Sequence, residues 1–226
     1  MILAAGRGER MRPLTDRMPK PLQEVRGKPL IVWQIEHLAL AGFNRLVINH
    51  AWLGAQLEDF VGDGHEWGVS VTWSREGQPL GTAGGVLQAL PLLDVDVFLL
   101  VSADIHTHYD FRAMARRMDL WSAGQGSHWL AHLVLIQDHR YPADFSLREG
   151  RVVPPAQGAG TYGNIGLYRR SFFDGTGLSS GPTSELGPLL RPAVDCGQVS
   201  GEWYEGSWTN VGRVEDLDRL NGKDTT

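Results

Sequence analysis

The sequence predicts an α/β fold with a Rossmann-like, mostly parallel but mixed sheet that is flanked by helices. Short apolar runs alternate with segments of helical period through the first 110 residues, which is typical of repeated strand–helix units. The run at residues 97–101, Val-Phe-Leu-Leu-Val, is apolar throughout, as expected of a buried central strand. Because strand–helix–strand units form parallel sheets with right-handed crossovers, these observations together predict the fold class.

The first half of the chain contains the repeated units. Residues 1–5 form a short apolar strand, and Pro29 can begin a helix that Gly42 ends. The remaining elements of this half are expected at residues 45–49 (strand), 51–61 (helix), 69–74 (strand), 84–90 (helix) and 97–101 (strand).

Beyond residue 110 the order of elements changes. We expect a helix at 111–122, strands at 129–136, 145–148 and 163–168, a helix at 185–194, a strand at 201–204 and a closing helix at 214–220. Pro154, Pro155, Gly158 and Gly160 interrupt this half, which predicts a loop at the mouth of a substrate site.

Composition and charge exclude several classes of protein. A chain of 226 residues that is 42% hydrophobic can bury a core as one domain over residues 1–226. The 21 basic and 26 acidic side chains indicate no surface for nucleic acid, and no apolar stretch reaches the roughly 18 residues of a membrane span. The single cysteine, Cys196, cannot form an internal disulfide. We therefore expect a cytoplasmic protein without a membrane or nucleic-acid partner; the oligomeric state stays open, and a monomer is compatible with the sequence.

A glycine-rich, basic turn follows the first strand. Gly6 and Gly8 allow backbone N–H groups to approach an anion closely. The basic side chains of the turn are Arg7, Arg10, Arg12, Arg17 and Lys20. Such a turn can cradle phosphate groups, so the expected ligand is a nucleotide.

Two common phosphate-binding motifs do not account for this turn. The chain has no G-x-x-x-x-G-K-[ST] run. A dinucleotide fingerprint would need a third glycine where Met11 stands and an acidic residue about 20 positions later, whereas the next strand ends in Asn49-His50.

Four motifs, taken in order, resemble the signature of sugar-1-phosphate nucleotidyltransferases. They are LAAGRGERMRPLT with PKPL (residues 3–15 and 19–22), LGTAGG (80–85), SAD (102–104) and WTNVG (208–212). The resemblance covers nearly the whole chain. It implies the nucleotide-diphospho-sugar transferase type of fold, with a nucleotide-binding half at residues 1–110 and a sugar-binding half at 111–226.

The resemblance also implies roles for individual residues. Arg10 would hold the departing pyrophosphate, and Lys20 would bridge the α-phosphate and the incoming phosphate, which makes these two the candidate catalytic residues. The candidate nucleotide-binding residues are Leu3, Ala4, Ala5, Gly6, Gly8, Arg10, Gly81 and Thr82. The candidate sugar-side residues are Asp104, Glu149 and Asn164, with Glu185 as a further one.

A metal site is expected at Asp104 and residue 210. Asp104 follows the central strand, where its carboxylate can enter a cleft at the sheet edge, and carboxylate oxygens suit Mg²⁺. His106 and His108 could instead suggest zinc. The family carries a second aspartate where this chain has Asn210, whose amide oxygen can coordinate Mg²⁺ without supplying negative charge. We therefore expect weaker metal binding, and slow or absent turnover remains an alternative.

Within the family, residues 48–54 and 161–166 are most similar to members that act on N-acetylmuramate 1-phosphate in cell-wall recycling. The implied reaction joins UTP and this sugar 1-phosphate to give a UDP-sugar and pyrophosphate. Two alternatives stay open. One is a guanylyltransferase for mannose or heptose 1-phosphate, since G-T-A-G-G also suits those relatives, and the choice among UTP, dTTP and GTP is not settled. The other is a nucleotide- or sugar-phosphate-binding relative whose catalysis Asn210 impairs.

Overall fold

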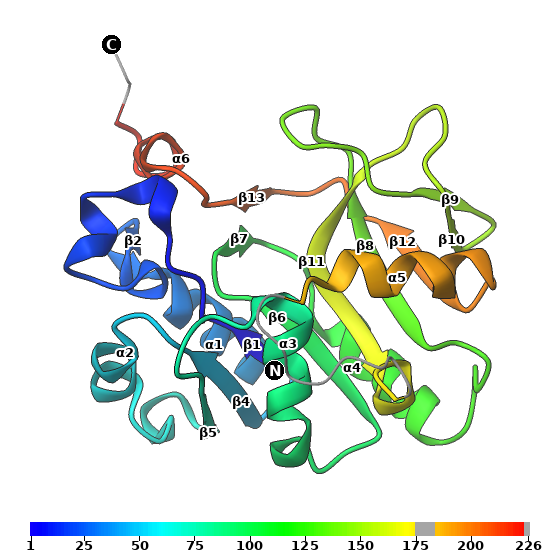
Figure 1. Cartoon of the computed structure of the whole chain (residues 1–226), viewed down its shortest axis with the longest axis horizontal. Coiled ribbons are helices and arrows are strands. Elements are labelled where there is room, and N and C mark those ends of the chain that lie inside the picture. The colour runs from blue at the N-terminus through cyan, green and yellow to red at the C-terminus, as the bar shows by residue number, and fades with distance from the viewer. Residues whose placement is uncertain (175–183, 224–226) are drawn as a thin grey trace.

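The computed structural model describes residues 1–174 and 184–223. In this part of the chain the main sheet has nine strands, in the order β5-β4-β1-β6-β11-β8-β12-β10-β9. Helices cover both of its faces (Figure 1). The strands of this sheet are β1 Ile2–Leu3, β4 Arg45–His50, β5 Ser70–Arg75, β6 Val97–Ser102, β8 Ala131–Ile136, β9 Ser146–Arg148, β10 Arg151–Val153, β11 Thr161–Arg169 and β12 Val199–Trp203.

The sheet is mixed, and its parallel part belongs to the first half of the chain. Strands β5, β4, β1 and β6 pair in parallel. Strand β11 is antiparallel to both β6 and β8, while β12 is parallel to β8 and antiparallel to β10. Strands β9 and β10 form a tight hairpin, and such a short connection permits only antiparallel pairing. The predicted mixed α/β sheet is confirmed, and antiparallel pairing dominates its second half.

The core lies on both faces of the central strand. Along β6, Leu99 and Val101 face one hydrophobic cluster, and Phe98 and Leu100 face the other, as the twofold period of a strand requires. The first cluster contains side chains of α1 (Leu30–Leu40), α2 (Gly54–Val61) and α4 (Arg112–Ser122). The second contains side chains of α3 (Gly81–Ala89) and α5 (Leu186–Asp195). The continuous apolar run predicted as a buried strand is therefore covered on both sides.

Most predicted helices are confirmed, but α2 begins three residues later than expected, at Gly54, and α3 begins earlier. Pro29 caps α1, the chain turns at Gly42 with φ +91°, and α6 (Val214–Leu220) has the predicted bounds. The expected start of α3 at residue 84 was wrong, because the helix begins at Gly81. The N–H groups of Ala83 and Gly84 donate to the carbonyl of Ser184, a partner that no local pattern reveals.

Several short elements position the site, and none of them was predicted from the sequence. Strand β13 (Trp208–Asn210) pairs antiparallel with β7 (Ile105–Thr107), so Asn210 lies opposite Ile105. Strands β2 (Glu24–Val25) and β3 (Lys28–Pro29) form a hairpin beneath α6 (Figure 1). Short 3-10 helices lie at Glu9–Met11, Leu14–Asp16, Lys20–Leu22, His65–Trp67, Leu90–Leu92 and Arg170–Phe172. None of the described helices is long and apolar enough to cross a membrane.

Candidate active site

A cavity of about 620 Å³, here called the large cavity, opens at the carboxyl ends of the parallel strands. Its walls include every residue that the sequence analysis proposed for the nucleotide, together with Lys20 and Asp104. The lining residues are Leu3, Ala4, Ala5, Gly6, Arg7, Gly8, Glu9, Arg10, Lys20, Pro21, Asn49, Pro79, Gly81, Thr82, Ser102, Ala103, Asp104, Glu185 and Gly212. All four sequence motifs thus contribute to one cavity.

The glycine-rich turn folds back on the lysine that follows it. Gly8 has φ +65°, and a Cβ at this position would lie 2.9 Å from Thr15 Cγ2 and 3.2 Å from Lys20 Cβ. The Thr15 hydroxyl donates to the Gly8 carbonyl at 2.8 Å. Only glycine fits both the backbone angle and the space, so Gly8 brings Lys20 against the turn.

Asn49 and Glu76 connect the first loop to α3. The Asn49 Oδ1 atom accepts from the Ala4 N–H at 2.8 Å, and its Nδ2 donates to Glu76 Oε1 at 2.6 Å. Glu76 Oε2 in turn accepts from the Leu80 N–H at 2.9 Å. Burial raises the pKa of the Glu76 carboxyl, while its hydrogen bonds with Leu80 and Asn49 act in the opposite direction. The sequence analysis did not assign this pair, although a polar Asn49 at the end of an apolar strand was a usable signal.

Lys20 and Asp104 form a short ion pair inside the large cavity. The Lys20 Nζ atom donates to Asp104 Oδ2 at 2.5 Å, and only 8% of the surface of Lys20 is exposed. Lysine is almost never this buried without a charged partner. Arg10 lies beside the last motif, since a Cβ at Gly212 would be 3.1 Å from Arg10 Nη2. The closing WTNVG motif therefore packs directly against the first motif.

Two acceptor oxygens beside this ion pair lack a donor. Asp104 Oδ1 and Asn210 Oδ1 are both buried and make no hydrogen bond in the described structure. The backbones of the two segments are close, because the Val211 N–H donates to the Asp104 carbonyl at 2.9 Å, whereas Asn210 is not among the residues that line the large cavity. Unpartnered oxygens of this kind suit a hard divalent cation. Among the described residues, no group of three or more His, Cys, Asp or Glu side chains is arranged to hold a metal, so His106 and His108 gain no support as a zinc site.

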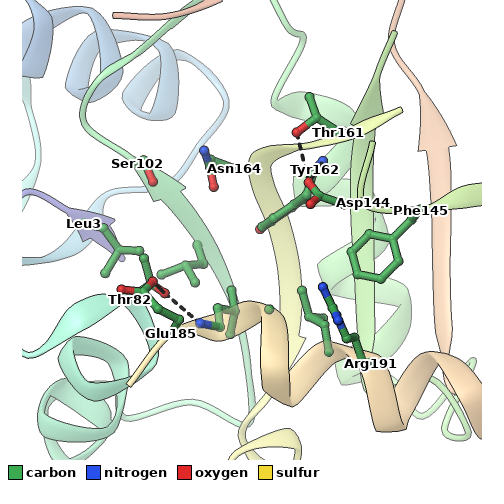
Figure 2. Close-up of a pocket in the computed structure, with 14 residues that line it drawn as sticks. Leu3, Thr82, Ser102, Asp144, Phe145, Thr161, Tyr162, Asn164, Glu185 and Arg191 are labelled. Atoms are coloured by element: carbon green, nitrogen blue, oxygen red, sulfur yellow. Dashed lines mark hydrogen bonds between the residues drawn. The ribbon is translucent and has the colours of Figure 1, made fainter. Parts of the chain in front are cut away.

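A second cavity of about 250 Å³, here called the small cavity, adjoins the large one. The two share Leu3, Thr82, Ser102 and Glu185. The other residues of the small cavity are Leu100, Asp144, Phe145, Thr161, Tyr162, Asn164, Leu186, Gly187, Leu190 and Arg191. Figure 2 shows these side chains gathered above α5 and beside β11.

Asn164 reaches the small cavity through an irregularity of β11. The register between β11 and β8 shifts between Tyr162 and Gly166, and Asn164 has φ +55°, a conformation in which asparagine is tolerated. In Figure 2 its amide faces the side where Ser102 lies. The structure thus places Asn164 at the cavity, as the sequence analysis proposed.

Of the other proposed sugar-side features, two lie away from the cavities and Glu185 lies at both. Glu149 is an exposed residue at the turn of the β9–β10 hairpin and lines neither cavity. The predicted mouth loop, residues 154–160, also lines neither of them. Glu185 lines both cavities, and its Oε2 accepts from the Thr82 hydroxyl at 3.0 Å. Asp144, Tyr162 and Arg191 were not predicted, because strand and helix patterns do not show which cavity a side chain enters.

Comparison with known proteins identifies the class. The nucleotidyl transferase family matches residues 1–139, more than half of the chain, and the protein belongs to that family. A solved structure described as a putative glucose-1-phosphate thymidylyltransferase from Bacillus anthracis, in complex with a sucrose, has a TM-score of 0.85. It covers 100% of this chain and 95% of its own at 20% identity, which confirms the fold alone.

Two curated relatives are more similar in sequence. The N-acetylmuramate alpha-1-phosphate uridylyltransferase of Neisseria meningitidis is 46% identical over 95% of this chain and 93% of that protein. The mannose-1-phosphate guanyltransferase of Saccharomyces cerevisiae is 32% identical over 96% of this chain, which spans only 62% of that relative's length. The first relative therefore matches in length as well as in sequence.

Proposed function

We propose that this protein transfers a uridylyl group from UTP to N-acetylmuramate 1-phosphate, giving a UDP-sugar and pyrophosphate. The observation that carries the proposal is the convergence of all four motifs on the large cavity, which the small cavity adjoins. The 46% identity to the Neisseria meningitidis uridylyltransferase, over nearly the whole of both chains, supports this choice of substrates.

The reaction needs no nucleophile from the protein. A phosphate oxygen of the sugar 1-phosphate attacks the α-phosphorus of UTP, and the bond from that phosphorus to the bridging oxygen breaks, so that pyrophosphate leaves with the electron pair. Two polyanions must meet in line, and the protein's task is to position them and to neutralise their charge. A glycine-rich turn with a buried lysine and an adjacent arginine suits this task.

Each half of the chain would supply most of the binding site for one of the two substrates. Apart from Glu185 and Gly212, the residues lining the large cavity lie within residues 1–110, which supports its assignment to the nucleotide. Most residues of the small cavity lie between positions 144 and 191, which supports its assignment to the sugar. The backbone of residues 3–6 and of Gly81 and Thr82 would frame the base and ribose.

Lys20 and Arg10 would bind phosphate groups in the large cavity. Lys20 is held in place by Asp104 before substrate arrives, so its ammonium group is already oriented toward the cavity. In the proposed complex it contacts the α-phosphate and the incoming phosphate, where negative charge shifts during the reaction. Arg10 lies against Gly212 and would contact the departing pyrophosphate.

Asp104 and Asn210 would hold a divalent cation, for which Mg²⁺ is the proposed ion. Their unpartnered oxygens fit a hard cation, and phosphate oxygens would complete its coordination. When bound, such an ion neutralises phosphate charge and orients the reacting groups. Because Asn210 supplies no negative charge, we expect the site to bind Mg²⁺ more weakly than a pair of aspartates would.

The experiment that tests the proposal measures pyrophosphate release with N-acetylmuramate 1-phosphate or mannose 1-phosphate, each with UTP, dTTP or GTP, over a range of Mg²⁺ concentrations. We expect release with N-acetylmuramate 1-phosphate and UTP. In Asn210→Asp the same reaction should need less Mg²⁺ for half-maximal rate. The matched control, Asn44→Asp, changes an exposed asparagine outside both cavities and should behave as the unmodified protein.

Two outcomes would contradict the proposal. Release only with mannose 1-phosphate and GTP would identify a guanylyltransferase. Binding of nucleotide without release, in both the unmodified protein and Asn210→Asp, would identify a non-catalytic binding protein.

A further inference from the structure

Arg191 is a cation without an anion in the wall of the small cavity. It lies on α5, and its side chain rises from that helix toward Phe145 and Asp144 (Figure 2). Within residues 1–174 and 184–223 its guanidinium group forms no ion pair or hydrogen bond. Among the residues that line the small cavity it is the one basic side chain.

The phosphate-binding groups lie in the other cavity. Arg10, Lys20 and Asp104 line the large cavity and not the small one, while Arg191 lines the small cavity and not the large one. The phosphates of both substrates are thus accounted for without Arg191. An anion that Arg191 binds must come from a different part of the sugar substrate.

One oxygen of each carboxylate in the small cavity accepts from a donor other than Arg191. Asp144 Oδ2 accepts from the Thr161 hydroxyl and from the Tyr162 N–H, each at 2.9 Å. Glu185 Oε2 accepts from the Thr82 hydroxyl at 3.0 Å. Neither carboxylate forms an ion pair with Arg191 in the described part of the chain, which leaves the guanidinium free to bind a ligand.

The helix that carries Arg191 packs against the core, while Arg191 itself is exposed. The N–H of Leu186, at the first turn of α5, donates to the Thr82 hydroxyl at 2.8 Å. The neighbouring Leu190 is 1% exposed within the core cluster that covers this face of the sheet. Arg191 thus projects from a helix that is packed on the core, and its planar group can bind a carboxylate through two parallel hydrogen bonds.

The muramate sugar has the anion that this geometry requires. N-acetylmuramate 1-phosphate is N-acetylglucosamine 1-phosphate with a lactyl ether on O3, so it bears a carboxylate in addition to its phosphate. We propose that Arg191 binds this lactyl carboxylate and selects carboxylate-bearing sugar 1-phosphates over neutral-sugar ones. The proposal rests on the function proposed above, because it assigns one specificity-determining contact of that substrate.

The test compares both sugar 1-phosphates, with UTP and Mg²⁺, in the unmodified protein, Arg191→Gln and Arg191→Lys. A charge-assisted pair of hydrogen bonds corresponds to a change of about 10–100-fold in binding. We expect Arg191→Gln to raise KM for N-acetylmuramate 1-phosphate by about that factor while kcat/KM for N-acetylglucosamine 1-phosphate stays within about threefold. Arg191→Lys should restore part of the preference, because it keeps the charge and loses the planar fork.

The matched control is Arg116→Gln, which removes an exposed arginine from α4, a helix that lines neither cavity. It should leave the kinetics with both sugars unchanged. Equal losses with both sugars in Arg191→Gln, or no loss with either, would overturn the assignment of Arg191.

Calorimetric binding of the two sugar 1-phosphates without nucleotide separates this proposal from the proposed function. If no pyrophosphate is released from UTP, the proposed function is rejected. The role of Arg191 is then tested by the affinities of the two sugar 1-phosphates alone. Tighter binding of N-acetylmuramate 1-phosphate that Arg191→Gln abolishes would support the contact. Equal affinity of the unmodified protein for both sugars would overturn it.

Discussion

At the scale of single residues, the Lys20–Asp104 pair prepares the large cavity for phosphate. The two charges lie 2.5 Å apart, and the side chain of Lys20 is 10% exposed while that of Asp104 is 26% exposed. A buried charge without a partner is costly, so the pair orients the Lys20 side chain in the absence of substrate. The second oxygen of Asp104 remains without a donor, which leaves it available for a cation.

Removal of the lysine tests this role. In Lys20→Ala we expect kcat for pyrophosphate release to fall by about 10²–10³-fold, the usual effect of losing one preorganised charge-stabilising donor. Lys28→Ala is the control, because Lys28 forms an ion pair of the same 2.5 Å length with Glu36 outside both cavities. A loss of less than about threefold in Lys20→Ala would remove Lys20 from the mechanism.

At the scale of elements, the turns that precede α3 and follow β1 depend on glycine. Gly81 has φ +75°, and a Cβ there would lie 2.7 Å from the Ser184 carbonyl oxygen. A Cβ at Gly8 would likewise lie 2.9 Å from Thr15 Cγ2 and 3.2 Å from Lys20 Cβ. These glycines allow close contact between segments, so they shape the cavity as well as the turns.

A comparison of Gly8→Ala with Gly27→Ala separates the effect of the left-handed backbone from the effect of the close contact at Gly8. Both positions have a left-handed backbone, with φ +65° and +73°, but a Cβ at Gly27 meets nothing within 4 Å. We expect each variant to lose about 1 kcal/mol of unfolding free energy from backbone strain, with a larger loss in Gly8→Ala. Only Gly8→Ala should also raise KM for UTP, since it displaces Lys20. Equal stability and equal KM in the two variants would contradict this role of the Gly8 turn.

At the scale of the whole molecule, a polar network connects the second half of the sheet to the segment that follows Asp104. Glu202 on β12 accepts from the Tyr109 hydroxyl at 2.5 Å and contacts His132 Nε2 at 3.3 Å and Arg117 at 3.5 Å. The hydrogen bond with His132 has the largest effect and lowers the pKa of Glu202, and the hydrogen bond from Tyr109 and the charge of Arg117 lower it further. Burial acts in the opposite direction, and the resulting pKa is about 2.

This network predicts how stability depends on pH. Because the pKa of Glu202 is about 2 in the folded protein and 4.5 ordinarily, the unfolded state binds more protons between these values. The stabilisation is complete above about pH 4.5 and is lost as pH falls toward 2. We expect Glu202→Gln to be less stable at pH 7 and to lose less unfolding free energy between pH 4.5 and 3, as measured with urea.

The control for this prediction is Glu66→Gln, which changes an exposed glutamate in a short helix. It should follow the pH dependence of the unmodified protein. If the unfolding free energy of Glu202→Gln falls with pH as steeply as that of the unmodified protein, the network does not link folding to proton binding.

The class of fold and the proposed phosphate-binding residues could be predicted from local sequence patterns. A strand followed by a glycine-rich turn is a local feature, and parallel strands bring their carboxyl ends to one edge. All eight predicted nucleotide contacts and Lys20 consequently line one cavity, although their roles remain proposals. The expected N-terminal strands and helices follow from the same local patterns of burial and turn residues.

Long-range packing determines how side chains reach the small cavity, although Asn164 and Glu185 were proposed from the sequence. Asn164 enters the small cavity through a register shift in β11, Arg191 enters it from α5, and Glu149 lies on a hairpin away from it. Asn210 reaches Asp104 because β13 pairs with β7, two segments about a hundred residues apart. Such contacts depend on how distant strands and helices pack together, and the periodicity of one segment carries no information about its distant partner.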